Sequence, residues 1–310
     1  MTKLGTSDLD VSRLCLGGNV FGWTADEETS LAVLDAYADA GGNFVDTADA
    51  YSAWAEGHVG GESETIIGRW LRRRGDRDSI VVATKVGALR GLDDLKAATI
   101  ERAAEDSLRR LGVDHIDLYY AHRDDPDTPQ EETLAAFDRL VTSGKVRHIA
   151  ASNYTADRLT SALAVSEREG FARFVALQQA YNLVDRSYEG ELSRAVADHG
   201  LASAPYWGLA KGFLTGKYRP GVAVESARAA AASKYLDERG LRILAALDEV
   251  AEAHGTTQSA VALAWLAEQP TVAAPIASAR TTDQLAELLP ALTLELKADE
   301  VAALTTASAV

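Results

Sequence analysis

Short apolar segments alternate with longer amphipathic segments along most of the chain, and this pattern predicts strands that alternate with helices. Eight apolar segments are six to eight residues long and are bounded by Gly, Asp or Asn, as expected for buried parallel strands. They are 12–18, 43–48, 79–86, 115–122, 146–152, 174–181, 201–207 and 271–278. The pattern therefore predicts eight strand–helix units.

Polar residues and glycines mark the ends of the expected helices. Thr24 with Glu27, and Thr281 with Gln284, have the spacing of a capping box, which satisfies free backbone amides at a helix start. Glycines typical of helix ends follow amphipathic segments at positions 41, 75, 112, 144, 170 and 200. An extra helix is expected at 238–255, between the seventh and eighth units, and a helical tail is expected at 298–308.

Eight strand–helix units predict an α/β fold, a (β/α)8 TIM barrel, rather than a doubly wound sheet. Residues 3–12 are expected to form a small N-terminal hairpin that plugs the barrel floor. The extra helix would precede the last unit, and the tail would form a C-terminal helix. No linker, low-complexity tract or internal repeat interrupts the pattern, so we expect residues 1–310 to form a single domain.

Composition narrows the classes of partner and compartment. Acidic side chains outnumber basic ones by 46 to 31, and the formal net charge of −15 argues against a nucleic-acid or anionic-membrane surface. The single cysteine, Cys15, excludes an intrachain disulfide and fits a reducing cytoplasm. We find no apolar signal segment and no run of about 18 apolar residues, so a cytoplasmic protein is expected. The oligomeric state stays open.

Candidate catalytic residues stand at the C-terminal ends of the predicted strands, where TIM barrels carry their active sites. Asp46 ends the second strand, Lys85 the third and His122 the fourth, and Tyr51 follows in the loop after the second strand. Each strand residue shares a face with an apolar residue two positions earlier, which suits a packed interior topped by a reactive layer. Singly, a capping Asp, a surface Lys, a core His or a packed Tyr is an ordinary alternative. The occurrence of all four residues at the C-terminal rim of the expected barrel favours a catalytic role over these separate structural roles.

A phenol, an ammonium, a carboxylate and an imidazole together suit carbonyl reduction. Tyrosine is a weak acid, with an ordinary pKa of about 10. An ammonium near 4 Å would favour the phenolate by about 4 kcal/mol at an effective dielectric of 20, so Lys85 is expected to lower the pKa of Tyr51 by roughly three units before burial opposes it. Asp46 would hold Lys85 charged, and His122 would hydrogen-bond the carbonyl oxygen.

Five segments resemble the aldo-keto reductase family of NAD(P)H-dependent (β/α)8 oxidoreductases: FVDTADAY, ATKVG, DLYYAHRDD, ASNY and GFLTGKY. The likeness runs in order from about residue 3 to residue 290. It implies reversible reduction of an aldehyde or ketone by direct hydride transfer, without a metal. It also implies that Tyr51 is the general acid, that Lys85 and Asp46 adjust its pKa, and that His122 orients the carbonyl.

A dinucleotide site is expected near the last two units, because two segments there, 206–217 and 278–285, suit phosphate binding beside a helix start. The resemblance implies contacts to the carboxamide, the ring, the pyrophosphate and the adenosine. Ser152, Asn153 and Gln178 would contact the carboxamide of the nicotinamide, and Tyr206 would contact its ring. Leu209, Lys211 and Gly212 would contact the pyrophosphate, and Gln284 the adenosine. Gly18, Asp46 and Ser278 complete the expected set. Arg280 would pair with a 2′-phosphate, which favours NADPH and leaves NADH as the alternative.

The substrate is less well defined by the sequence. Phe21, Trp23 and Trp54 are expected at the pocket rim, where they would favour a flat or partly apolar carbonyl, although packing of these aromatics on one another fits equally well. Nothing selects among aldehydes, ketones, sugars and keto-steroids. The pair Trp207-Gly208 stands where many relatives carry Ser-Pro, which weakens the expected contacts near the pyrophosphate.

Two alternatives to an NADPH-dependent reductase remain. One is a regulatory or interaction subunit that binds NADPH on the same fold and turns over little. The other is a cofactor-free barrel lyase or isomerase that uses Lys85 as a Schiff base.

Overall fold

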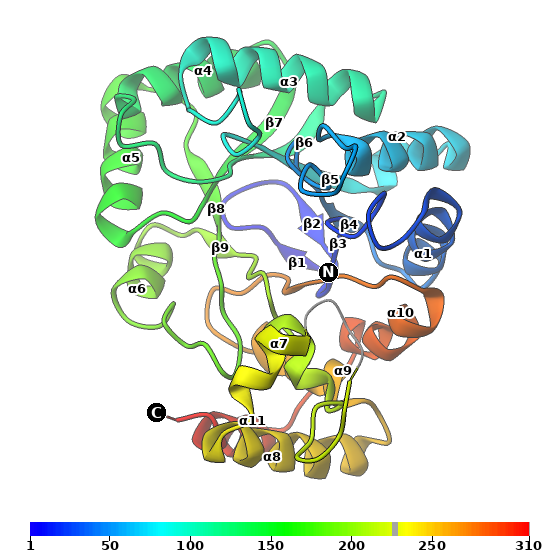
Figure 1. Cartoon of the computed structure of the whole chain (residues 1–310). Helices are drawn as coiled ribbons and strands as arrows, with labels where there is room; N and C mark the ends of the chain where they lie inside the picture. The colour runs from blue at the N-terminus through cyan, green and yellow to red at the C-terminus, as the bar shows by residue number, and fades with distance from the viewer. Residues whose placement is uncertain (225–228, 310) are drawn as a thin grey trace.

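A closed barrel of parallel strands forms the centre of the protein (Figure 1). The computed structural model describes residues 1–224 and 229–309. The strand order is β10-β3-β4-β5-β6-β7-β8-β9, and a parallel bridge from Ser203 of β9 to Val272 closes the ring. The strands are β3 (Cys15–Gly17), β4 (Phe44–Asp46), β5 (Val81–Val86), β6 (Ile116–Ala121), β7 (Val146–Ser152), β8 (Phe174–Gln178), β9 (Ala202–Ser203) and β10 (Ile276–Ala277). The predicted (β/α)8 fold is confirmed.

Helices surround the barrel (Figure 1). They are α1 (Glu27–Asp39), α2 (Glu62–Arg74), α3 (Ala97–Leu111), α4 (Gln130–Thr142), α5 (Ala156–Glu169), α6 (Glu191–Asp198), α7 (Ala229–Ala232), α8 (Glu238–His254), α9 (Gln258–Ala267), α10 (Thr282–Leu288) and α11 (Ala298–Ala307). The predicted extra helix is α8, and the predicted tail is α11. All six glycines expected at helix ends have positive φ angles, which glycine adopts without steric cost.

The start of α1 differs from the prediction. Asp26, not Thr24, caps this helix: its carboxylate accepts a hydrogen bond of 2.9 Å from the amide of Thr29. Thr24 lies in a preceding turn, where its amide donates to the carbonyl of Val20. Asp is at least as good an N-cap as Thr and stands closer to the apolar face of the helix, so the helix begins two residues later.

The predicted N-terminal hairpin is present and fills one end of the barrel. β1 (Thr2–Lys3) pairs antiparallel with β2 (Asp10–Val11). Leu4, Leu9 and Val11 are buried in the same apolar cluster as barrel-interior residues such as Phe44. A Cβ on Gly5 would lie 2.2 Å from the Val175 carbonyl oxygen, so the hairpin approaches the strands too closely for any other residue.

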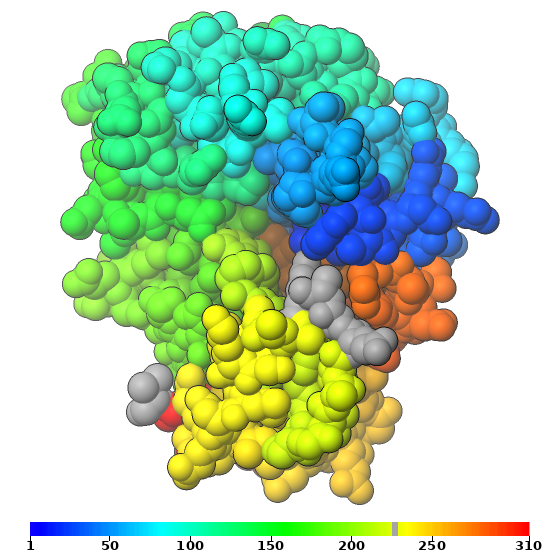
Figure 2. Space-filling view, viewed as in Figure 1, coloured from blue at the N-terminus to red at the C-terminus, as the bar shows by residue number. Residues whose placement is uncertain are grey.

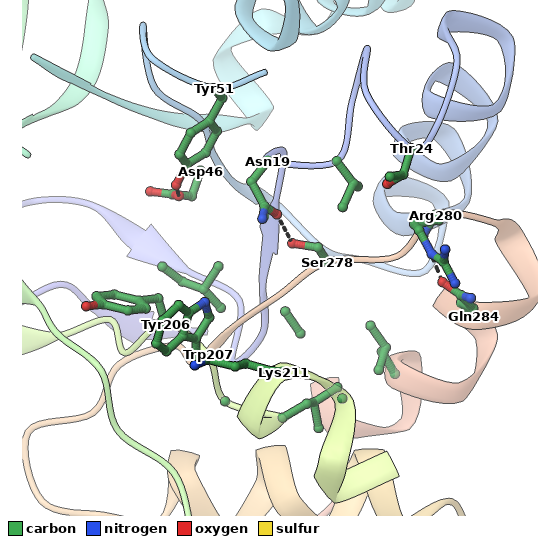
Figure 3. Close-up of a pocket in the computed structure, with 18 of the residues that line it drawn as sticks. Asn19, Thr24, Asp46, Tyr51, Tyr206, Trp207, Lys211, Ser278, Arg280 and Gln284 are labelled. Atoms are coloured by element: carbon green, nitrogen blue, oxygen red, sulfur yellow. Dashed lines mark hydrogen bonds between the residues drawn. The ribbon is translucent and has the colours of Figure 1, made fainter. Parts of the chain in front are cut away.

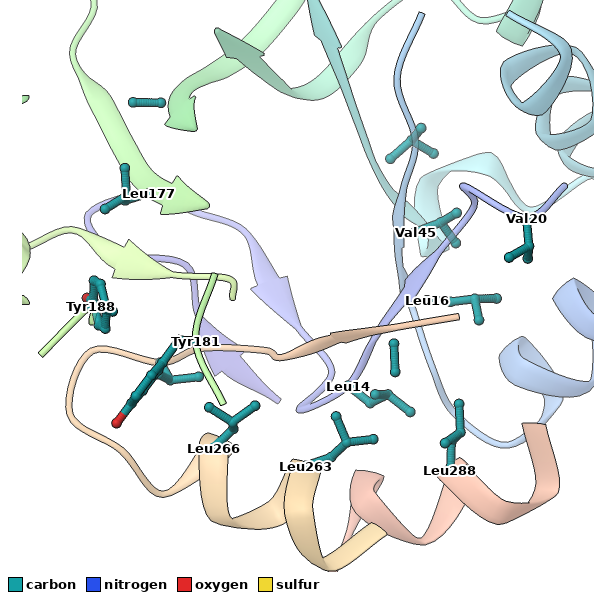
Figure 4. Packing of buried hydrophobic residues seen from close by; sticks show 14 of the residues in the cluster. Leu14, Leu16, Val20, Val45, Leu177, Tyr181, Tyr188, Leu263, Leu266 and Leu288 are labelled. Carbon is teal, nitrogen blue, oxygen red and sulfur yellow. The ribbon is translucent and has the colours of Figure 1, made fainter. Parts of the chain in front are cut away.

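A second apolar layer separates the strands from the helices. Leu14 and Leu16 project from the β3 segment toward Leu263 of α9 and Leu288 of α10, all in one buried cluster (Figure 4). Side chains alternate along the strands, so Val45 belongs to this outer layer while its neighbours face the barrel interior. The same alternation directs side chains at the strand ends toward the barrel mouth.

The first and last thirds of the chain meet beside that mouth. Helices α1 and α10 are in contact, and Figure 2 shows the blue N-terminal segment beside the orange segment that contains α10. Within the two described ranges, no helix combines the length and apolar character needed to cross a membrane.

Candidate active site

Four elements place the candidate catalytic residues at the mouth of the barrel. Asp46 is the last residue of β4, Lys85 is near the end of β5, and His122 directly follows β6. In the sheet, Asp46 is paired with Ala83 and Lys85 with Tyr120. Lys85 and His122 therefore each lie two positions beyond the partner of the preceding residue, so the three residues form a staggered row along the ends of neighbouring strands. Tyr51 is carried by the turn after β4, where its amide donates to the carbonyl of Ala48.

Lys85 is at the centre of a buried hydrogen-bond network. Its ammonium donates to Asp46 Oδ2 at 2.7 Å, to the Thr47 carbonyl at 2.7 Å and to the Tyr51 hydroxyl at 2.9 Å. These bonds use all three N–H donors of a side chain that is fully buried. Asp46 also accepts a bond of 3.2 Å from the Tyr51 hydroxyl and one of 2.9 Å from the Gln178 amide. The phenol, ammonium and carboxylate are therefore held as one unit.

The electrostatics of Tyr51 differ from the sequence expectation. Burial, and after it the negative charge of Asp46, raise the pKa of the Tyr51 phenol well above its ordinary value. We expected Lys85 to lower this pKa. In the structure Lys85 forms an ion pair with Asp46, and its positive charge does not outweigh the effect of burial on Tyr51. The phenol is consequently protonated at neutral pH, which is the form that can donate a proton.

His122 completes the group as a neutral imidazole. Its ring centroid lies 6.1 Å from that of Tyr51 at an interplanar angle of 75°. Burial, with smaller contributions from Lys85 and Arg123, lowers the pKa of His122 to about 3. A neutral imidazole has one N–H to donate, so His122 can act as a hydrogen-bond donor to a ligand oxygen without carrying charge.

A cavity of about 550 Å³ opens above this network, within the range typical of ligand pockets (Figure 3). Most residues predicted for the site line it. They are Asp46, Tyr51, His122, Ser152, Asn153, Gln178, Tyr206, Leu209, Lys211, Gly212, Ser278, Arg280, Gln284, Trp23 and Trp54. Trp23 and Trp54 form an edge-to-face pair with centroids 5.4 Å apart, and Trp54 packs in the same way against Tyr51.

Three predicted residues do not line the cavity. Lys85 lies beneath its floor and acts on it only through Asp46 and Tyr51. Gly18 faces α2, because a Cβ there would lie 2.8 Å from the Ser63 hydroxyl, and Gly17 lines the cavity instead. Phe21 is fully buried in the outer apolar layer, so its ring is not available to a substrate.

Asn153 connects the His122 side of the cavity to the Tyr206 side. Its backbone is left-handed, with a φ of 58°. Its side-chain amide donates to the His122 carbonyl at 2.9 Å and to the Ser152 hydroxyl at 3.0 Å, and its oxygen accepts from the Tyr206 hydroxyl at 2.8 Å. These bonds hold the Tyr206 ring beside the amide of Asn153 and the hydroxyl of Ser152. A planar ligand that carries an amide could pack on such a ring and hydrogen-bond to such groups.

The far end of the cavity carries Arg280 beside the start of α10. Thr281 caps that helix as predicted, accepting a bond of 3.2 Å from the Gln284 amide. In a complete capping box the Gln284 side chain would accept from the Thr281 amide. Here it accepts from the Arg280 amide, one residue earlier, at 3.0 Å. In the described parts of the chain the Arg280 guanidinium forms no ion pair. It is therefore free for an anionic ligand.

Several cavity residues were not predicted individually. They are Gly17, Asn19, Val20, Thr24, Trp207, Gly208, Thr215, Lys217, Ser259, Ile276, Ala277, Glu287 and Leu288, of which those at 207–217 lie in a segment that was expected to bind phosphate. Asn19 directly follows the first predicted strand and accepts a 2.6 Å bond from Ser278 (Figure 3). The rule that found Asp46 and His122, a polar residue at a C-terminal strand end, would have found Asn19 as well. Among residues 1–224 and 229–309, no cluster of three or more metal-binding side chains occurs.

Comparison with known proteins agrees with this geometry: residues 13–309 match the Aldo/keto reductase family. The chain belongs to that family. The match covers every strand of the barrel and the whole cavity lining, so the network around Lys85 lies in the matched region.

Three relatives of this aldo-keto reductase bear on its activity. It is 37% identical to an uncharacterized oxidoreductase, YrpG, of Bacillus subtilis, over 95% of this chain and 91% of the relative. It is 33% identical to norsolorinic acid reductase stcV of Emericella nidulans, over 94% and 76%. It is 34% identical to a probable voltage-gated potassium channel subunit beta of Oryza sativa, over 94% and 90%. Family and relatives together support an oxidoreductase that reduces carbonyl compounds.

Proposed function

We propose that the protein reduces an aldehyde or ketone with NADPH, and oxidises the corresponding alcohol in the reverse direction, with Tyr51 as the general acid. The observation that carries the proposal is the network in which Lys85 contacts both Asp46 and the Tyr51 hydroxyl beneath an open cavity. A protonated phenol directed at a cavity beside a neutral His122 is a proton donor with a second hydrogen-bond donor next to it.

The cavity fits a phosphorylated dinucleotide. Lys211, Lys217 and Arg280 line it, and within the described ranges none of them forms an ion pair, although the chain as a whole is acidic. Unpaired cations around a cavity favour a polyanionic ligand, and the planar Arg280 fork suits a 2′-phosphate. Bound NADPH supplies a hydride from its nicotinamide ring. Ser152, Asn153 and Gln178 would hold the carboxamide, and Tyr206 would pack on the ring.

The residues of the chain then have distinct roles. Tyr51 holds a proton and gives it to the carbonyl oxygen of the substrate. Lys85 and Asp46 fix the position of the hydroxyl, and Lys85 stabilises the phenolate that remains after proton transfer. His122 donates a hydrogen bond to the same carbonyl oxygen and orients it.

The two alternatives differ in their support. A regulatory subunit with little turnover is favoured by one observation, the 34% identity to a probable potassium channel subunit beta. A Schiff-base enzyme is disfavoured by geometry, because the Lys85 nitrogen has no exposed position and all its donors are used. A nucleophilic lysine needs a free amine that can reach the substrate.

Loss of NADPH absorbance against a panel of aldehydes, ketones and sugars tests the proposal, with Tyr51→Phe beside the wild type. Removing the hydroxyl should reduce turnover by about 10²- to 10⁴-fold, the usual contribution of general acid catalysis. The dissociation constant for NADPH should stay within about threefold, because the ring remains in place. Tyr235→Phe, at a tyrosine outside the cavity lining, is the matched control and should retain full turnover.

Two results would contradict the reductase. Tight NADPH binding by the wild type without turnover across the panel would favour the regulatory subunit. Turnover in Tyr51→Phe close to that of the wild type would remove Tyr51 from the mechanism.

A further inference from the structure

Trp207 differs from the other tryptophans near the site, because its backbone is strained and its ring holds a cation. Three of the five tryptophans are exposed, and all three line the cavity: Trp23, Trp54 and Trp207. Trp207 is 46% exposed and has a φ of 56°, in the left-handed region that residues with a Cβ rarely adopt. Such strain persists where the surrounding structure enforces it, and it concentrates at functional sites.

Hydrogen bonds fix the backbone around Trp207, so the side-chain ring is the part that can change its position. The Trp207 carbonyl accepts a 3.0 Å bond from the side chain of buried Asn182 and a 2.7 Å bond from the Ala210 amide. Ala210 and Lys211 are also left-handed, with φ of 47° and 59°. These dihedral angles turn the chain back on itself, so that Lys211 returns over the residue four positions earlier.

The result is a cation–π contact at the cavity wall. The Lys211 ammonium lies 4.4 Å from the centroid of the Trp207 ring (Figure 3). The same ring packs edge-to-face against Tyr206, with centroids 5.4 Å apart. Lys211 forms no ion pair among the residues that the structure describes. Its attractive partner is thus an aromatic face in a chain where carboxylates are abundant.

We propose that Trp207 is a positioning residue for the dinucleotide: its indole holds the Lys211 ammonium at the cavity wall, ready to pair with the pyrophosphate. This inference rests on the proposed NADPH binding. A ring face orients a cation without neutralising it and leaves its N–H donors available to phosphate oxygens, whereas a carboxylate partner would compete with the phosphate. Pre-orientation also removes part of the side-chain entropy that a free lysine would lose on binding.

A double-mutant cycle measured by calorimetry with NADPH, without substrate, tests the coupling. Trp207→Leu should weaken NADPH binding by about threefold, the effect of one exposed cation–π contact. Lys211→Met should weaken binding by about tenfold, as expected for a lost charge-assisted contact. In the Lys211→Met background, Trp207→Leu should have no further effect. Trp207→Phe keeps a ring face and should restore binding to within about twofold of the wild type.

Two controls separate positioning from a general disturbance of the cavity. Lys217→Met removes another cavity cation, which lies 5.4 Å from the Tyr218 ring centroid, so Trp207→Leu should keep its full effect in that background. In the nucleotide-free protein, the Trp207 part of the fluorescence, taken as wild type minus Trp207→Phe, should change when Lys211 is replaced by Met. A structural role alone would not produce that dependence on Lys211.

The outcomes are distinct for this inference and for the proposed function. Equal effects of Trp207→Leu with and without Lys211 would mean that the indole acts on the nucleotide directly, and would overturn the inference. Unchanged Trp207 fluorescence in Lys211→Met would do the same. Absence of any NADPH or NADH binding to the wild type would overturn the cofactor proposal itself and this inference with it.

Discussion

Asp49 is a fully buried carboxyl group that lies two residues before Tyr51 and takes no part in the network around Lys85. Neither of its side-chain oxygens has a hydrogen-bond partner in the described ranges. Burial, and after it the nearby Glu64 carboxylate, raise the pKa of Asp49 from 3.8 to about 8. Glu64 forms an ion pair with Arg110, at 2.6 Å. The stability of Asp49→Asn relative to the wild type should therefore increase as the pH rises.

The sign follows from the two pKa values. In the unfolded chain Asp49 loses its proton near pH 3.8, whereas in the folded protein it keeps the proton up to about pH 8. The stability that the protonated group contributes is complete below about pH 4 and is lost as the pH rises through about 8. At about 1.36 kcal/mol per pKa unit, the loss between pH 5 and pH 8 is at most about 4 kcal/mol. Relaxation around a buried charge reduces this, so we expect about 2 to 4 kcal/mol.

Asn has nearly the shape of a protonated Asp and does not ionise, so the variant should lack this pH dependence. Urea unfolding of both proteins at several pH values between 5 and 8 measures the difference. The advantage of Asp49→Asn should grow with pH by about 2 to 4 kcal/mol across this range, while the burial of an unpaired amide subtracts a constant of about 1 to 3 kcal/mol.

Asp78→Asn, at an exposed residue without an ion pair in the described part of the chain, is the control and should change stability little at any pH. A stability difference between wild type and Asp49→Asn that stays constant from pH 5 to pH 8 would refute the reasoning. It would mean that Asp49 is ionised in the folded protein and is stabilised by a partner.

Three further predictions concern the site. Arg280→Ala should weaken NADPH binding by about ten- to a hundredfold and leave NADH binding nearly unchanged, and an unchanged ratio of the two dissociation constants would contradict a 2′-phosphate contact. His122, with its pKa lowered to about 3, should show no titration of its ring protons by NMR between pH 5 and pH 8. Lys85→Met should cost about 3 to 5 kcal/mol in urea unfolding because it leaves Asp46 buried without its cation, and Asp46→Asn in the same chain should recover part of that loss.

The fold was predictable because strand and helix periods are local properties of the sequence. Each of the eight predicted strands overlaps an observed one, and the rule for C-terminal strand ends located Asp46, Lys85 and His122 without knowledge of their partners. Seven of the predicted strands are longer than the observed ones, and the segment 146–152 has the bounds of β7. Apolar character extends beyond the ladder into the turns, where the chain is buried but unpaired, so composition alone does not fix the strand ends.

The orientation of single side chains was not predictable, because it depends on neighbours that are distant in sequence. Phe21 follows a strand end, where pocket residues are expected, but packing in the outer apolar layer buries it completely. Trp23, two residues later, lines the cavity and is partly exposed. Trp207 lies in a segment that was expected to bind phosphate, but the sequence gave no indication that its ring would contact Lys211. That contact requires left-handed dihedral angles at residues for which the sequence gives no such signal.

The pKa of Tyr51 is raised, although Lys85 was expected to lower it before burial opposed the effect, and the reason bears on the mechanism. A free Lys85 ammonium would favour the phenolate. In the structure this ammonium lies 2.7 Å from Asp46, and Asp46 lies 3.2 Å from the phenol and repels a phenolate. The pair therefore presents Tyr51 with nearly zero net charge in a buried setting, and the proton stays on the oxygen. A general acid needs that state before transfer. The stabilisation that Lys85 offers is useful only afterwards, when the phenolate forms at 2.9 Å from its ammonium, so the network favours the proton transfer over loss of the proton to solvent.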